Sequence, residues 1–274
     1  MLTASRVLTR AQAGEPLPVV FRSLDRRGIR PRRGQITMVA GQTNAGKSMW
    51  SLYYALRLSE QGERVLYFSA DSDEHTQGTR MAAMITGQTT ESVEEGIKAG
   101  GQAYYEDALG GVDLRMDFNS NPTLDDIDLT VAAYEELHGA WPTVIIVDNL
   151  INVEGYSGEG DSEKHGLMEI QRVLKHICRQ TSTAILLMHH CSEAEGRPYY
   201  PPTRRRILQK VNDLPENILT IAYDPTTEQF GIAAVKLRNG KADPEAREPV
   251  WLAADMDRCR FADTKIELIT MGSI

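Results

Sequence analysis

Cysteine is scarce in this sequence, and its positions do not suit cross-linking. Only three cysteines occur among 274 residues, and they lie far apart, at Cys178, Cys191 and Cys259. No two of them form a Cys-x-x-Cys pair, which argues against a disulfide framework and against a structural zinc site. We therefore expect three reduced thiols with structural roles.

Long apolar runs are also lacking. The longest runs, such as Ala184 to Met188, have the length of a strand and are far too short to span a membrane. The N-terminus, Met-Leu-Thr-Ala-Ser-Arg, has no apolar segment of the kind that a secretory signal needs. The sequence therefore predicts a cytoplasmic protein with no membrane partner.

A net positive charge is missing as well. The formal net charge is −8, so the chain as a whole has no electrostatic attraction for nucleic acid. Any such binding has to be local, and a charge run is more often a solvated surface than a binding site. Two basic clusters qualify: Arg26, Arg27, Arg30, Arg32 and Arg33, and later Arg204, Arg205 and Arg206.

Predicted strands and helices alternate from residue 34 onward, whereas residues 1–33, polar and interrupted by Pro16 and Pro18, suggest an arm or linker. Short apolar runs separated by stretches with helical spacing are typical of an α/β fold with a mostly parallel sheet flanked by helices. The predicted strands of this part are Ile36 to Ala40, Arg64 to Ala70, Leu114 to Phe118, Thr143 to Val147 and Ala184 to Met188.

The helices are expected between these strands. Two cover Lys47 to about Gln61 and Glu74 to Ile85, and a third opens after Pro122 with Thr123 as its N-cap and Asp126 as the capping-box acid. A fourth is marked by the helical spacing of its apolar positions, Leu167, Ile170, Val173, Leu174 and Ile177.

From Ile218 the pattern changes to β-structure alone. Ile218 to Tyr223 and Gly231 to Leu237, joined by Asp-Pro-Thr-Thr-Glu, predict a hairpin. Two further strands are expected near Val250 to Ala253 and Arg260 to Phe261. The prediction is one parallel α/β domain with a C-terminal β-hairpin extension.

One segment matches G-x-x-x-x-G-K-[ST] completely, between a predicted strand and a predicted helix. Its glycines let backbone N–H groups turn toward phosphate oxygens at the positive end of the helix. Lys47 is expected to reach the β- and γ-phosphates of ATP, and Ser48 to offer its hydroxyl to Mg²⁺. The residues of this P-loop are Gly41, Gln42, Thr43, Asn44, Ala45, Gly46, Lys47 and Ser48.

A magnesium ion at a P-loop needs a second anchor, normally an acid at the end of a buried strand. Asp148 directly follows the apolar run Thr143 to Val147 and supplies such a carboxylate. The alternative is that Asp148 is only an N-cap or turn residue at the strand end. The complete P-loop favours Asp148 and Ser48 as the metal-binding pair.

Hydrolysis also requires a group that orients or deprotonates the attacking water. The strand Arg64 to Ala70 ends in three acids, Asp71, Asp73 and Glu74. Spacing alone does not select one of them, and Asp73 and Glu74 suit the N-terminus of the following helix equally well.

Two histidines, His189 and His190, follow the apolar strand Ala184 to Met188. Neighbouring residues of a strand point to opposite faces, so they are poor joint metal ligands. A single polar residue at the strand end, close to the phosphates, is the simpler interpretation.

With these motifs in place, the chain resembles the RecA-like ATPase domain of DnaB-type replicative helicases, and the shorter RepA-type hexameric helicases. The resemblance covers roughly residues 20–265 and would make residues 34–274 the ATPase domain. Val65 to Asp71 is similar to the family's V-L-x-F-S-L-E strand, and Ser23 to Gly41 to its entry segment. The resemblance places Asp71, shorter by one methylene, where the family has its catalytic glutamate, and His190 at the γ-phosphate sensor position.

The segment Val235 to Gly240 is similar to the family's K-x-R-[NG] segment, and Trp251 to Phe261 to its last hairpin. In the family, the lysine and arginine reach into the ATP site of the neighbouring subunit. The resemblance therefore implies catalytic roles for Lys236 and Arg238, and a homo-oligomer in the form of a hexameric ring.

By the same resemblance, the loops that touch DNA would follow Asp148 and His190. The first, Glu154 to Glu163, is acidic and ill suited to phosphates, whereas the second, Arg197 to Lys210, is basic. Its candidate contacts with single-stranded DNA are Arg204, Arg205, Arg206 and Lys210.

The leading hypothesis is a Mg²⁺-dependent ATP-hydrolysing motor that acts on single-stranded DNA as a helicase. The alternative is an oligomeric ATP-dependent switch or loader that unwinds nothing, which the acidic first loop favours. A small-molecule kinase with the same P-loop is disfavoured by the C-terminal β-structure and by Arg238.

Overall fold

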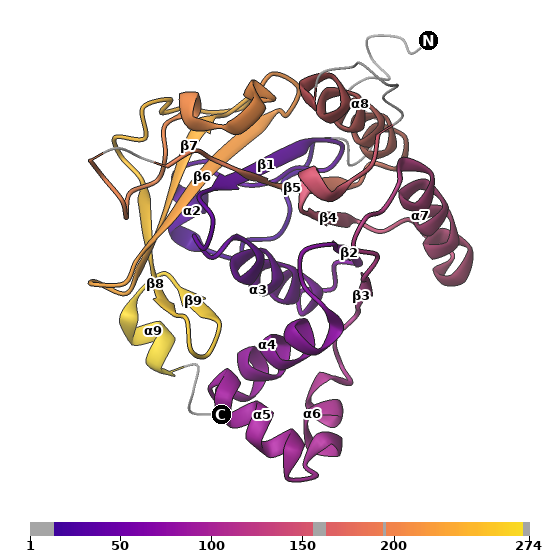
Figure 1. Ribbon diagram of the computed structural model, residues 1–274, viewed down its shortest axis with the longest axis vertical. Helices are drawn as coiled ribbons and strands as arrows, with labels where there is room; N and C mark the ends of the chain where they lie inside the picture. The colour runs from indigo at the N-terminus through magenta and orange to yellow at the C-terminus, as the bar shows by residue number, and fades with distance from the viewer. Residues whose placement is uncertain (1–13, 156–162, 194–195, 271–274) are drawn as a thin grey trace.

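The computed structural model describes residues 14–155, 163–193 and 196–270. Within these ranges a nine-stranded sheet runs through the protein in the order β3-β2-β4-β5-β1-β6-β7-β8-β9 (Figure 1). The strands from β3 to β6 in this order are parallel, and β7, β8 and β9 are added in antiparallel fashion. The predicted α/β class with a mostly parallel sheet is confirmed.

Every predicted strand is present, with bounds shifted by one or two residues. The parallel part consists of β1 (Ile36–Gly41), β2 (Val65–Ser69), β3 (Leu114–Asp117), β4 (Val144–Asp148), β5 (Ala184–His190) and β6 (Asn217–Asp224). The antiparallel part consists of β7 (Gln229–Lys236), β8 (Val250–Asp255) and β9 (Arg260–Ala262). The pair β6–β7 is the predicted C-terminal hairpin.

Helices cover both faces of the sheet, which explains why the central strands are apolar throughout. Helix α3 (Lys47–Ser59) packs on one face, in a core cluster that includes Trp50 and Leu52. Helices α7 (Leu124–His138) and α8 (Glu163–Thr181) pack on the other face through side chains such as Ile127 and Leu174. The two clusters form one layered core.

The predicted capping signals are present. Thr123 accepts a hydrogen bond from the backbone N–H of Asp126, and the Asp126 carboxylate accepts one in return from the backbone of Thr123. Helix α4 (Glu74–Thr86) begins after Asp73, whose carboxylate accepts from the backbone N–H of Thr76 at 2.8 Å.

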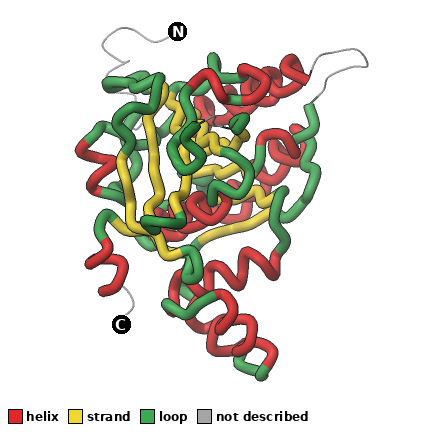
Figure 2. The backbone as a smooth tube through the Cα atoms, turned by 60° about the vertical axis from the view of Figure 1, so that its left-hand side comes forward, coloured by secondary structure: helices red, strands yellow, loops and turns green. Residues whose placement is uncertain are grey.

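Helices α5 (Thr90–Lys98) and α6 (Gln102–Leu109) were not predicted from the sequence patterns. With α4 they form a projection beyond the edge of the sheet (Figures 1 and 2). A small apolar cluster holds it together, and Val93 is the only buried residue that α5 contributes. Two short helices with so few buried positions give a weak apolar pattern, so the periodicity did not reveal them.

Residues 14–33 differ from the expected arm or linker. Leu17, Phe21 and Leu24 are buried in the core cluster of α3, and Leu24 belongs to a short helix, α2 (Arg22–Arg26), which precedes β1 in the chain. The segment is thus part of the packed domain. The N-terminal basic cluster includes ion pairs within the chain, such as Arg33 with Glu63 at 2.6 Å.

The remaining described residues complete the fold. Helix α9 (Lys265–Thr270) follows β9, and the short 3-10 helices η1 (Leu150–Asn152), η2 (Arg204–Arg206) and η3 (Leu208–Lys210) lie in the two loops. The three cysteines are buried and free. None of the helices built from the described residues has the length and apolar character to cross a bilayer.

Candidate functional site

The P-loop connects β1 to α3 at the carboxyl edge of the parallel strands. Gly46, at its end, has φ of 80°, a left-handed conformation that glycine adopts without steric cost. Gly41, at its start, lies so close to β6 that an added Cβ would meet Ile221 Cγ1 at 2.9 Å. The two glycines therefore permit the tight turn that leaves the N-terminus of α3 facing the loop.

Lys47 points back into the P-loop. Its side chain is largely buried, and Nζ donates hydrogen bonds to the backbone oxygens of Gln42 at 2.8 Å and Gly41 at 3.3 Å. Burial lowers the pKa of Lys47, and the nearby carboxylate of Asp148 opposes that shift. A cation enclosed by the loop lies where phosphate groups would be held.

Asp148 ends β4 and is 1% exposed. Its Oδ2 accepts a hydrogen bond from the Tyr67 hydroxyl at 2.8 Å, and that hydroxyl lies 2.8 Å from Ser51 Oγ. Burial raises the pKa of Asp148, while Tyr67 and the hydroxyl of Ser48 lower it.

The donor set fits a magnesium ion. Oδ1 of Asp148 is buried without a hydrogen-bond partner of ordinary geometry among the described residues, although Ser48 is close enough to influence the carboxyl. A buried oxygen without a partner carries a cost unless a ligand satisfies it. Carboxylate and hydroxyl oxygens are ligands that Mg²⁺ accepts together with substrate phosphates.

The structure separates the three acids after β2. Asp73 is the N-cap of α4, and its hydrogen bonds from Thr76 lower its pKa. Glu74 lies in the first turn of the same helix. Asp71 is exposed and close enough to Lys47, Asp148 and His190 to shift the pKa of each of them.

The two histidines at the end of β5 point in different directions, as expected for neighbours on a strand. His189 is fully buried, and its Nε2 lies 3.2 Å from the backbone oxygen of Leu208. His190 faces the P-loop, with Nδ1 3.4 Å from Lys47 Nζ. Its Nε2 lies 2.7 Å from Nδ2 of Asn149, the residue after Asp148. Burial and Lys47 both lower the pKa of His190.

Lys236 and Arg238 lie at the amino-terminal end of the parallel strands, whereas the P-loop lies at their carboxyl end. Lys236 is paired with Ile218 near the start of β6, and its Nζ donates to the backbone oxygens of Asn212 and Asp213. Arg238 is 57% exposed at its side chain, with Nη1 3.3 Å from Oε1 of the buried Glu216. Since β1 has six residues and a strand rises about 3.3 Å per residue, roughly 20 Å of strand separates this end from the chain's own P-loop.

The basic second loop, Arg197 to Lys210, lies within the described residues. Arg204 is partly buried, and Nη2 donates to the backbone oxygen of Asn212. Arg205 is 86% exposed and lies 3.8 Å from Glu245. Lys210 is exposed, whereas Arg206 is partly buried. Most of the acidic first loop, residues 156–162, lies outside the described residues.

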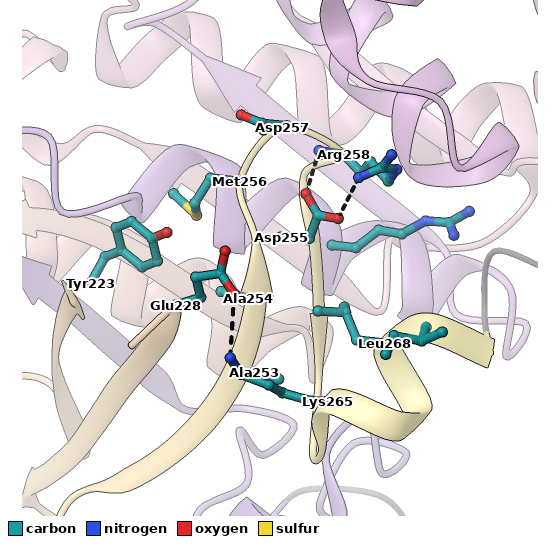
Figure 3. Close-up of a pocket in the computed structure, with 12 residues that line it drawn as sticks. Tyr223, Glu228, Ala253, Ala254, Asp255, Met256, Asp257, Arg258, Lys265 and Leu268 are labelled. Carbon is teal, nitrogen blue, oxygen red and sulfur yellow. Dashed lines mark hydrogen bonds and ion pairs between the residues drawn. The ribbon is translucent and has the colours of Figure 1, made fainter. Parts of the chain in front are cut away.

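A pocket of about 460 Å³ is lined by residues of β8, of the turn that follows it and of α9 (Figure 3). Met256, in the turn between β8 and β9, connects this pocket to the P-loop, because its Cε lies 3.1 Å from the position of a Cβ built on Gly46. Tyr223 and the ion pair between Lys265 and Glu228 contribute to the same pocket.

Three residues of this region were not predicted from the sequence: Tyr67, Asn149 and Met256. Tyr67 lies in the middle of an apolar strand, where a tyrosine is most often simple core. Asn149 follows the strand-end acid directly, and this adjacency is the one signal that was available. Met256 reaches the P-loop only through the antiparallel pairing of the C-terminal strands, which no local pattern encodes.

Comparison with known proteins shows the family to which this chain belongs and the fold that it shares. The sequence pattern of the AAA domain matches residues 13–196. The gene 65 protein of Mycobacterium phage L5 is 32% identical over 245 residues, which cover 87% of this chain and 90% of that protein. The gene 65 protein of Mycobacterium phage D29 is 29% identical over 219 residues, with 78% and 92% covered.

Solved structures match over nearly the whole chain. A DnaB-like replicative helicase, described together with its interactions with primase, superposes with a TM-score of 0.80 at 15% identity over 94% of this chain and 66% of the helicase chain. A second solved structure, of an ATPase domain, gives a TM-score of 0.80 at 13% identity, with 95% of both chains covered. The predicted RecA-like P-loop NTPase fold is confirmed by these two matches.

Proposed function

Since this chain belongs to the AAA domain family, we propose that it is a Mg²⁺-dependent ATPase and acts on single-stranded DNA as a helicase-like motor. The observation that carries the proposal is one cluster at the carboxyl edge of the sheet. There the enclosed cation of Lys47 lies 3.4 Å from His190 and close to the buried carboxylate of Asp148.

Each residue of this cluster has a defined task. Residues Gly41 to Ser48 hold the triphosphate through backbone N–H groups, and Lys47 neutralises the β- and γ-phosphates. Ser48 and Asp148 hold Mg²⁺, which neutralises charge on the phosphates when bound. Asp71 orients the attacking water and accepts its proton, and His190 contacts the terminal phosphate.

We propose further that the active form is a homo-oligomer, with a hexameric ring as the arrangement that the resemblance implies. Arg238, supported by Lys236, serves the site of a neighbouring subunit. The support is its position, because Arg238 is exposed and lies at the sheet edge opposite its own P-loop.

Single-stranded DNA is proposed to bind the second loop. Arg205 and Lys210 are its exposed cations, and Arg204 and Arg206 lie beside them. Because the chain is acidic overall, binding depends on this local group. The DNA contact is the step that distinguishes a motor from an ATP-dependent switch or loader.

The test is ATP hydrolysis by the wild-type protein with Mg²⁺, in the presence and absence of single-stranded DNA. We expect hydrolysis that DNA stimulates, and loss of hydrolysis to background in Lys47→Ala. The matched control is Lys98→Ala, which removes an exposed lysine of α5. Near-normal turnover by folded Lys47→Ala would refute the P-loop assignment. Hydrolysis without any DNA binding at low salt would favour the switch or loader.

A further inference from the structure

Glu216 is a buried carboxylate that directly precedes β6, and several cations surround it. Its side chain is 2% exposed, Oε1 lies 2.8 Å from Lys175 Nζ, and Nη1 of Arg238 donates to the same oxygen at 3.3 Å. Oε2 accepts from the backbone N–H of Ile36, the first residue of β1, at 3.1 Å. A buried carboxylate is costly unless it is paired and hydrogen-bonded. Its two oxygens therefore connect the start of β1 to the guanidinium of Arg238.

The next residue holds the backbone of the same arginine. Arg238 lies two residues beyond the end of β7, outside the hydrogen-bonded part of the strand. Asn217 is 5% exposed, and its Oδ1 accepts from the backbone N–H of Arg238 at 3.2 Å. Nδ2 of Asn217 lies 3.4 Å from Oγ1 of Thr37 in β1. Glu216 and Asn217 thus attach both ends of Arg238 to the central strands.

One corner of the guanidinium is held while the rest faces outward. The side chain of Arg238 is 57% exposed, and within the described residues its contact with Glu216 uses Nη1. A guanidinium carries five N–H donors in a fixed plane, so the donors of Nε and Nη2 remain for a group outside the subunit. An unrestrained arginine on a surface samples many rotamers, and ordering it on binding costs entropy. Restraint before the neighbour arrives removes part of that cost.

We propose that Glu216 and Asn217 are positioning residues for Arg238, and that they present its outer donors to the terminal phosphate in the adjacent subunit. This inference rests on the proposed function, in which Arg238 serves the site of a neighbour. The competing interpretation is structural. Because both residues are hydrogen-bonded to β1, which ends at Gly41, they could instead support the P-loop of their own chain.

Glu216→Gln tests the contact with little change of size. The amide has a single oxygen, which cannot serve both the N–H of Ile36 and the guanidinium of Arg238 as the two carboxylate oxygens do. We expect kcat to fall about 10²-fold, the cost of misplacing a group by about 1 Å. Binding of a non-hydrolysable ATP analogue should change little. The matched control is Glu63→Gln, which breaks the ion pair with Arg33 at a side chain that is 9% exposed, and should keep the wild-type kcat.

Mixing of chains separates the two interpretations. Lys47→Ala chains cannot hydrolyse ATP themselves but retain a correctly held arginine. Added to Glu216→Gln chains, they should raise the turnover per Glu216→Gln chain, because some interfaces then combine an intact P-loop with an intact arginine. If Glu216 supported the P-loop of its own chain through Ile36, the defect would remain in the chain that carries Lys47, and mixing would restore nothing.

Asn217→Ala is the second variant, and it alone decides if thermal melting shows that Glu216→Gln does not fold. It removes the acceptor for the backbone N–H of Arg238 and should show the same loss of kcat and the same rescue by Lys47→Ala chains. Wild-type kcat in the folded variants, a loss that mixing does not rescue, or an equal loss in Glu63→Gln would overturn the inference. If Arg238→Ala keeps the wild-type kcat, or is not rescued by Lys47→Ala chains, the shared site of the proposed function is wrong instead.

Discussion

The hydroxyl of Tyr67 donates a hydrogen bond to Oδ2 of Asp148 at 2.8 Å, between the neighbouring strands β2 and β4. Both groups are buried, and burial is the main reason that the pKa of Tyr67 is raised. Oδ1 of the same carboxylate has no such partner among the described residues. Tyr67 therefore orients the carboxylate so that one oxygen remains for a ligand.

Replacing Tyr67 with phenylalanine removes this support and leaves Asp148, the proposed metal ligand, in place. Groups that orient a ligating carboxylate typically change metal affinity by about 10–100-fold when lost. We expect the Mg²⁺ concentration for half-maximal hydrolysis to rise by about tenfold. Tyr105→Phe loses a hydrogen bond to Gln88 in the helical projection and should leave that concentration unchanged. Equal Mg²⁺ dependence in both variants would contradict the role of Tyr67.

The acids after β2 should separate catalysis from folding. Asp71→Asn should lose most turnover and still bind ATP, because binding depends on the P-loop. Asp73→Ala should lower the thermal midpoint, since it removes the N-cap of α4, and should retain turnover. Steady-state hydrolysis and thermal melting of both variants distinguish the catalytic acid from the helix cap. If only Asp73→Ala lost turnover, the catalytic acid would be Asp73 and not Asp71.

Catalysis should depend on assembly through Arg238. An arginine that stabilises transition-state charge across an interface contributes about 10³–10⁵ in rate. Specific activity should therefore rise with protein concentration, and Arg238→Ala should be inactive while binding ATP. Mixing Arg238→Ala with Lys47→Ala chains should restore some activity, because some interfaces then combine an intact P-loop with an intact arginine. No rescue, together with activity that is independent of concentration, would rule out the shared site.

The second loop should control the salt dependence of DNA binding. Each phosphate contact contributes about 0.7 to the log–log slope for single strands. Arg205→Ala should flatten that slope by about 0.7, and the triple replacement of Arg204, Arg205 and Arg206 by about 2. Binding titrations over a range of salt concentrations measure the slope. Arg115→Ala, at an exposed position on β3, is the control and should leave the slope unchanged.

Stability should fall in mild acid because of His189. Burial lowers the pKa of His189 to about 4, so between pH 6.5 and 4 the unfolded chain binds the proton that the folded chain excludes. The free energy of unfolding should therefore decrease as pH falls through this range, by at most about 3.5 kcal/mol at about 1.4 kcal/mol per pH unit. His189→Gln should flatten the dependence, whereas His176→Gln, at an exposed position of α8, should not. Denaturant melts at several pH values provide the comparison.

Much of the fold was predictable because its signals are local. The P-loop, the apolar strands and the Thr123–Asp126 capping box depend on residues that are neighbours in the chain. Local signals did not predict helices α5 and α6 or the packing of residues 14–33. Their few buried side chains are buried by residues that lie far away in the chain.

The amino-acid sequence by itself determined that a P-loop follows a buried strand, and that Asp148 and His190 end two other strands. Parallel strands bring their carboxyl ends to one edge, so these residues had to be near each other. Only the tertiary structure decided which groups meet there: Asp71 rather than Asp73, and Asn149 against His190. It also decided that Arg238 lies at the opposite edge, beside Glu216. Contacts of a few ångströms between segments far apart in the chain depend on strand order and register, which no local pattern specifies.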